Sequence, residues 1–133
     1  MIRIGIIGTG HGVRTLKPGF EYTQAARVVA LAGSSIERAR QVASENDIEI
    51  ACGSAVELCA LPSLDLICVA SPNRFHVEHA ITAIQSGKHV YLEKPIGNSR
   101  NQALQIQEAL NNSAQDRLVF VGHQLRFNPF IRE

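Results

Sequence analysis

The chain has 133 residues, of which 45% are hydrophobic and 19% are charged, and its formal net charge is +1 at pH 7. This length is typical of one domain with its own core, and the composition is that of a folded globular protein. Lysine and arginine are scattered along the chain, so we expect neither nucleic acid nor a membrane as a partner. No apolar run approaches the length of a membrane span.

Six short apolar runs alternate with segments in which apolar residues return every three or four positions. The runs predict strands at residues 2–8, 27–32, 48–51, 64–70, 89–92 and 118–122. Alternation of this kind predicts an α/β fold with a doubly wound parallel sheet, covered by helices on both faces. Three capping-box patterns predict helix starts, namely Ser34 with Glu37, Ser54 with Glu57, and Ser99 with Gln102.

The chain has three cysteines, an odd number that does not allow all of them to pair in disulfides, and none of them forms a C-x-x-C pair. They are Cys52, Cys59 and Cys68, and the last lies within an apolar run. We interpret them as buried thiols. Together with the absence of an apolar leader after Met1, they favour the reducing cytoplasm.

A glycine-rich turn follows the first predicted strand. It consists of Gly8, Thr9, Gly10, His11, Gly12 and Val13. Glycines at this place let the backbone approach a pyrophosphate, whose charge is met by N–H groups at a helix start. Val13 occupies the position of the third glycine of G-x-G-x-x-G, and an ordinary strand-to-helix turn is the alternative. We interpret the turn as a dinucleotide-binding site.

The second predicted strand ends without a carboxylate that would bond a ribose 2′-hydroxyl. The chain has Gly33, Ser34 and Ser35 there, and Arg38 follows within the next helix. These residues could accommodate the 2′-phosphate of NADP, and the sequence favours NADP over NAD. In the alternative interpretation, Ser34 caps the helix and Arg38 is solvated.

Polar residues also follow the fourth and fifth predicted strands. They are Ser71, Pro72, Asn73 and His76 after the fourth, and Glu93 and Lys94 after the fifth. Ligands bind at the carboxyl edge of an open parallel sheet, so these residues are candidates for a binding site. Asn73 as a helix cap, His76 as a backbone-bonded residue and Lys94 as a solvated lysine remain the structural alternatives. The sequence is also compatible with a cis peptide bond before Pro95.

Taken together, these motifs resemble the Gfo/Idh/MocA family, the relatives of glucose-fructose oxidoreductase and inositol dehydrogenase. The segments that carry the resemblance are residues 8–12, 36–39, 71–73 with His76, 86–90, 93–95 and 122–129. The resemblance implies a Rossmann-type NAD(P)-binding domain over residues 1–122. Residues 123–133 would then start the connection to a second, substrate-binding domain, which these residues do not contain.

The resemblance also implies roles for individual residues. Lys94 would face the nicotinamide and the substrate hydroxyl and assist proton removal, and Glu93 would help to position it. Asn73 and His76 would line the dinucleotide cleft, and Arg126 would lie near the domain junction. No metal site is expected.

The function implied is hydride transfer between NAD or NADP and a hydroxyl of a sugar, inositol or similar polyol. This chain alone is expected to be inactive, since the second domain would supply the other catalytic residues and the oligomer contacts. The opening of a further helix is expected at residues 131–133. The alternative is a non-catalytic sensor or regulator of the same family that binds NAD(P).

Overall fold

The computed structural model describes residues 1–114 and 116–131, and within them a six-stranded sheet forms the centre of the molecule. The strands are β1 (Ile2–Ile7), β2 (Ala26–Ala32), β3 (Ile50–Cys52), β4 (Leu66–Val69), β5 (His89–Leu92) and β6 (Val119–Val121). Their order is β3-β2-β1-β4-β5-β6, and every neighbouring pair is parallel. This is the Rossmann order, so the predicted doubly wound parallel sheet is confirmed.

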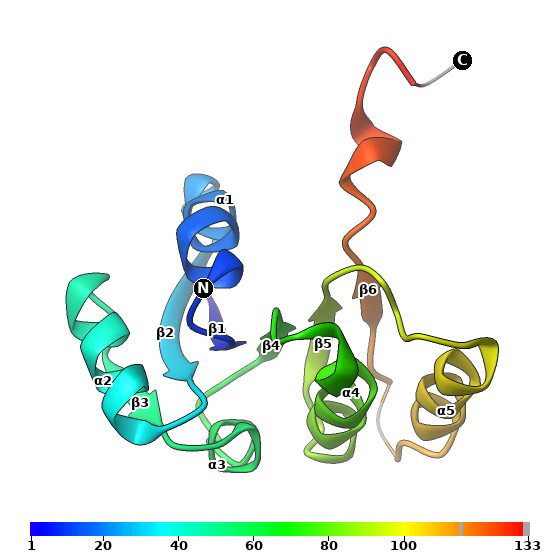
Figure 1. Cartoon of the computed structure of the whole chain (residues 1–133), viewed down its shortest axis with the longest axis horizontal. Helices are drawn as coiled ribbons and strands as arrows, with labels where there is room; N and C mark the ends of the chain where they lie inside the picture. The colour runs from blue at the N-terminus through cyan, green and yellow to red at the C-terminus, as the bar shows by residue number, and fades with distance from the viewer. Residues whose placement is uncertain (115, 132–133) are drawn as a thin grey trace.

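Five α-helices in the described part of the chain cover the two faces of this sheet. They are α1 (Lys17–Tyr22), α2 (Ile36–Glu45), α3 (Ala55–Cys59), α4 (His76–Gln85) and α5 (Arg100–Asn111). Figure 1 shows α1 on one side of the sheet and α4 and α5 on the other. The layers follow from the crossovers, because parallel neighbours require a connection that passes over a face of the sheet.

Two apolar cores form, one on each face. Side chains of the segment before α1 and of α2 pack with β1 and β2 in the first core, which includes Val13, Val42 and Ile6. Helices α3, α4 and α5 build the second core, which includes Leu58, Ile84 and Ile106. Both faces of the central strands are therefore buried, and the continuous apolar runs of these strands are explained.

The predicted and observed strands agree in number and order, and they differ at the ends. Ile48 was predicted to begin the third strand, but its N–H bonds the carbonyl of Ala43 at 2.9 Å. Asp47 before it has a φ of 54°. Ile48 thus belongs to the turn that ends α2, and its buried side chain joins the core between that helix and the sheet.

The predicted capping box at Ser34 and Glu37 is wrong by one residue. The hydroxyl of Ser35 accepts from the N–H of Arg38 at 3.2 Å and caps α2. Two adjacent serines satisfy the pattern equally well, and the backbone conformation decides between them. Ser34 stays exposed, so it is available to a ligand.

The other two predicted helix starts are confirmed. Ser54 accepts from the N–H of Glu57 at 3.1 Å, and Ser99 accepts from the N–H of Gln102 at 3.3 Å. The return bonds of Glu57 and Gln102 go to the N–H of the residue before each serine. Each loop that leaves the sheet is thereby fixed to the helix it enters.

All three cysteines are free and buried, as predicted. Burial raises the pKa of the Cys59 thiol to about 11 and also raises the pKa of the Cys52 and Cys68 thiols. Because the thiolate is the reactive form, we expect the folded chain to resist Ellman's reagent at pH 8. All three thiols should react once the chain is unfolded in guanidinium. Rapid labelling of any one of them without denaturant would contradict this burial.

The segment after β6 projects from the sheet and ends at the top of Figure 1. It contains a 3₁₀ turn at Gln124–Phe127, and its apolar side chains are exposed, with Phe130 at 92%. The helix opening predicted at 131–133 lies partly outside the described residues. None of the helices in residues 1–114 and 116–131 combines the length and the apolar character that a membrane crossing requires.

Candidate functional site

The glycine-rich turn lies at the carboxyl end of β1, and two of its glycines are required by the protein's own packing. Gly8 has a φ of 126°, and a Cβ there would clash with the carbonyl oxygen of Ala70. A Cβ at Gly12 would lie 2.8 Å from the Cβ of Ala70 and 2.9 Å from a methyl group of Ile6. Gly12 thus permits the close approach of helix and strand for which the fingerprint uses its third glycine, although Val13 occupies that position.

Gly10 differs from both of these glycines. Apart from Gly10 itself and its two chain neighbours, a Cβ built at Gly10 meets no heavy atom of the described chain within 4 Å, and the φ of Gly10 is outside the left-handed region. Nothing within the described chain requires a glycine there. The space above Gly10 is open for a group from outside the protein.

The second loop at this edge comes close to the first. A Cβ at Gly33 would lie 3.0 Å from the methyl group of Thr9 and 3.1 Å from the carbonyl oxygen of Ser35. The loops after β1 and β2 therefore meet tightly at Gly33. They form one continuous wall next to the point where the strand order reverses.

A pocket of about 490 Å³ opens at this carboxyl edge. It is formed by the loops after the first four strands together with the start of α4. Its lining residues are Ile7, Gly8, Thr9, Ala32, Gly33, Ser34, Gly53, Ser54, Ala55, Ser71, Pro72, Arg74, Phe75, Glu78 and His79. The structure thus brings Gly8, Thr9, Gly33, Ser34, Ser71 and Pro72 of the predicted site together.

Aromatic and charged side chains form the α4 side of this pocket. The guanidinium of Arg74 lies 4.6 Å from the ring centre of Phe75, and the imidazole of His79 stacks on the same ring at 5.6 Å. The Nδ1 of His79 is 2.9 Å from the hydroxyl of Ser71. Burial lowers the pKa of His79, an effect reinforced by His76 and opposed by Glu78. His79 is therefore neutral at pH 7 and available as a hydrogen-bonding group.

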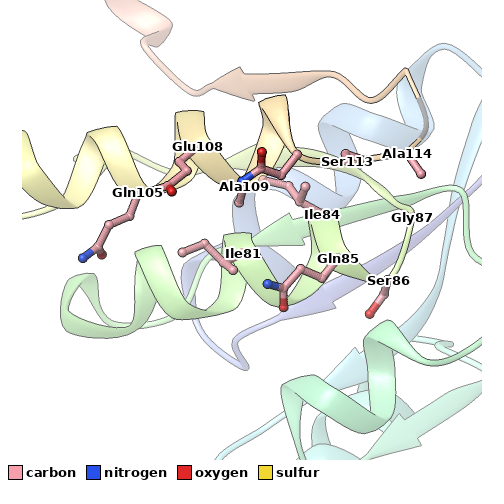
Figure 2. A pocket seen from close by; sticks show the side chains of 11 residues that line it. Ile81, Ile84, Gln85, Ser86, Gly87, Gln105, Glu108, Ala109, Ser113 and Ala114 are labelled. Atoms are coloured by element: carbon pink, nitrogen blue, oxygen red, sulfur yellow. The ribbon is translucent and has the colours of Figure 1, made fainter.

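A larger pocket, of about 670 Å³, lies elsewhere, between α4 and α5 (Figure 2). Ile81, Ile84 and Ala109 give it an apolar floor, and glutamine side chains of both helices surround that floor. Gly87 on its wall precedes β5, so this pocket is at the amino ends of the strands. Ligands of open parallel sheets bind at the carboxyl ends, and we therefore take the smaller pocket as the candidate site.

Glu93 and Lys94 follow β5 on the same carboxyl edge. Glu93 accepts from the hydroxyl of Tyr91 at 3.3 Å and from the backbone N–H of Lys94 at 3.3 Å. Burial and the charge of Glu93 raise the pKa of Tyr91 to about 12, so Tyr91 remains a neutral donor. The Lys94 side chain is exposed, and the Lys94–Pro95 bond is cis.

Several other predicted residues do not line the pocket. His76 is 1% exposed, and both of its ring nitrogens contact backbone carbonyl oxygens, which is the structural alternative considered for it. Asn73 is exposed at the start of a 3₁₀ turn, where no side-chain cap forms. The Arg38 guanidinium donates to Gln41 at 3.0 Å along its own helix. Arg126 is exposed in the segment after β6.

The remaining predicted residues stay close to the turn. Gly10 is half-buried and His11 is exposed, and neither belongs to the pocket lining. Val13 is 2% exposed and belongs to the core between the sheet and the first two helices. Ser35 caps α2 and is half-buried.

The prediction did not include four side chains on the α4 side of the pocket, namely Arg74, Phe75, Glu78 and His79. Phe75, Glu78 and His79 are spaced i, i+3 and i+4, which places them on one helical face. The residues Gly53, Ser54 and Ala55 after β3 were also missed as pocket residues. The sequence signal for them was their place after a strand. Within residues 1–114 and 116–131, no cluster of three metal-binding side chains occurs.

Comparison with known proteins places this geometry in a family. Residues 2–123 match the family model GFO_IDH_MocA, described as the oxidoreductase family with an NAD-binding Rossmann fold. An uncharacterized oxidoreductase of Synechocystis is 36% identical over 132 residues, which cover 96% of this chain and 34% of the relative. Inositol 2-dehydrogenase 1 of Saccharopolyspora erythraea is 35% identical over 133 residues, covering 96% of this chain and 38% of the relative.

A solved structure shows the same arrangement. It is that of a 3-ketoreductase from Actinomadura kijaniata in complex with TDP-benzene and NADP, in an open conformation. It aligns with a TM-score of 0.86 and 26% identity over 98% of this chain and 41% of that one. The chain therefore spans somewhat more than a third of the length of the relatives it matches.

Proposed function

The chain belongs to this oxidoreductase family with an NAD-binding Rossmann fold, and we propose that it is the cofactor-binding part of a dehydrogenase or reductase that acts on a hydroxyl of a sugar, inositol or similar polyol. The observation that carries the proposal is the open space above Gly10 beside a pocket at the switch point of the sheet. The inositol dehydrogenase relative supports the substrate class.

The residues of the turn fit a nicotinamide dinucleotide. Gly8 and Gly12 shape the turn for the protein's own packing, whereas Gly10 leaves the backbone accessible to a pyrophosphate. The N–H groups at the start of the following helical segment would meet its negative charge. Phe75 and His79 line the pocket and would contact the adenosine end of the cofactor.

In the reaction, the nicotinamide ring supplies the hydride acceptor or donor. Lys94 would lie near the carbon that reacts, and its ammonium would favour loss of the hydroxyl proton as hydride leaves. Glu93 holds the backbone N–H of Lys94, and Tyr91 in turn holds Glu93. These two residues would restrict the directions in which Lys94 can point.

We further propose a preference for NADP. The loop after β2 contains Gly33, Ser34 and Ser35 and no carboxylate that would repel a 2′-phosphate. Two arginines are candidates for binding the 2′-phosphate of NADP. Arg74 lines the pocket, and Arg38 is on α2 with its side chain bonded to Gln41.

A titration of the chain with NADPH and NADH, followed by nicotinamide fluorescence, tests the preference. We expect NADPH to bind at least about tenfold more tightly, a difference of ~1.4 kcal/mol. Replacing Arg38 or Arg74 by alanine, whichever binds the 2′-phosphate, should abolish this difference in affinity without weakening the binding of NADH. Equal affinity of wild type for both cofactors would overturn the preference and leave the dinucleotide site itself standing.

The protein that carries this chain would use it together with a substrate-binding domain, because the relatives are much longer than the matched segment. That domain would supply the substrate contacts and the oligomer interface. A non-catalytic sensor would bind cofactor equally well, but the exposed side chain of Lys94 at the carboxyl edge of the sheet favours the catalytic function. The free buried thiols support a cytoplasmic location.

A further inference from the structure

His76 occupies an unusual place for a histidine at the first position of a helix. It begins α4, yet its side chain is 1% exposed. Its Nδ1 is 2.7 Å from the carbonyl oxygen of Pro95, and its Nε2 is 2.9 Å from the carbonyl oxygen of Ser71. One ring thus joins two loops that are far apart in the sequence.

The two loops are the two functional parts of the proposed site. Ser71 lines the pocket, and its hydroxyl contacts His79, which lines the pocket as well. Pro95 directly follows Lys94. A continuous series of polar contacts therefore runs from the pocket wall through His76 to the residue next to the lysine.

The contacts also define what His76 can do. Both partners are carbonyl oxygens, which only accept, so the imidazole acts as a donor. A neutral ring donates to one of them and a protonated ring to both. Because the ring is buried behind the pocket wall, it cannot touch the cofactor or the substrate directly.

We propose that His76 is a positioning residue that fixes Lys94 relative to the cofactor pocket. This inference rests on the proposed function of Lys94 and of the pocket. The ring holds the Pro95 carbonyl against the loop after β4, so movement of the pocket wall is transmitted to the lysine. Removal of its ring nitrogens releases the segment around Lys94 and leaves the pocket in place.

The first experiment measures amide hydrogen exchange by NMR in the 133-residue chain without ligand. The variant His76→Phe keeps a ring of similar size and removes both nitrogens. We expect exchange at Lys94 and Ile96 to accelerate at least about tenfold, with β1 amides unchanged. Unchanged exchange at Lys94 and Ile96 would overturn the proposal. Faster exchange throughout β1 would overturn it too, since it would indicate a general loss of stability.

His89→Phe is the matched control. His89 also makes two contacts through its ring, with the N–H of Leu118 at 3.2 Å and with Arg117 at 3.5 Å. It begins β5, at the opposite end of the strand from Lys94. The same substitution there should leave exchange at Lys94 and Ile96 as in wild type.

The second experiment adds ADP-ribose, which carries the adenosine and pyrophosphate of the cofactor but no nicotinamide. In wild type its binding should shift the amide signals of the pocket loops and also those of Lys94 and Ile96. In His76→Phe the pocket signals should still shift, while the response at Lys94 and Ile96 falls by more than about half. An equal response in the variant would overturn the proposal.

If His76 only stabilised the fold, its replacement would weaken the shifts of the pocket signals and those of Lys94 and Ile96 together. If ADP-ribose fails to bind the wild type, the proposed function of the pocket is contradicted. The hydrogen exchange result then decides by itself whether His76 holds the Lys94 segment.

Discussion

Replacing Gly10 by valine is expected to weaken cofactor binding about 100-fold, or ~2.7 kcal/mol, while the fold stays intact. Space around Gly10 is open within the protein, so the added side chain meets no protein atom within 4 Å at its Cβ. It would instead occupy the space that the pyrophosphate needs next to the backbone. The free energy of unfolding should change by no more than about 0.5 kcal/mol. Calorimetric titration and thermal melting of the same sample measure both quantities.

Gly19→Val is the matched control, because a Cβ at Gly19 also meets nothing within 4 Å and lies on the outer part of α1. It should leave affinity for the cofactor unchanged. Gly12→Val gives the opposite pattern, since its Cβ would press on Ala70 and Ile6 and should destabilise the fold by about 1–3 kcal/mol. Wild-type affinity in Gly10→Val would show that the cofactor does not approach this turn.

Replacing Lys94 by methionine is expected to lower turnover about 10²–10⁴-fold, the range for loss of a general acid–base group. The measurement requires the chain joined to a substrate-binding domain, with inositol and related polyols as substrates. Cofactor affinity should be nearly unchanged, since the methionine side chain is similar in length. The loss would therefore be in kcat.

Lys17→Met provides the comparison for this variant. Lys17 forms an ion pair of 2.7 Å with Glu21 on α1, so the substitution removes the same charge away from the strand ends. Its turnover should stay close to that of wild type. Equal turnover of Lys94→Met and wild type would refute the catalytic role of Lys94 and favour the non-catalytic alternative.

The sequence was sufficient to predict the sheet and the position of the glycine turn, for identifiable reasons. Strands buried on both faces leave continuous apolar runs, and β1 leads directly into Gly8. Local patterns were less reliable where two residues satisfy the same rule. Ser34 and Ser35 illustrate this, because the backbone at the start of α2 selects Ser35 as the cap.

The side chains that complete the site depend on contacts between distant segments. His76 is predicted to line the cleft, but it is buried, and its Nδ1 contacts the carbonyl oxygen of Pro95, 19 residues away in the sequence. Arg38 was expected near a phosphate, and it bonds Gln41 at the i, i+3 spacing of its own helix. The pocket residues Phe75 and His79 required the position of α4 relative to the loop after β2. A one-dimensional pattern does not contain these distances.

Chemical-shift mapping of the 133-residue chain with NADPH tests the central assignment most directly. We expect saturable shifts at Gly8, Gly10 and Gly12, in the loop at Gly33, and at Ser71 of the pocket wall. Shifts confined to the larger pocket between α4 and α5, or no shifts at millimolar NADPH and NADH, would contradict the assignment of the cofactor site.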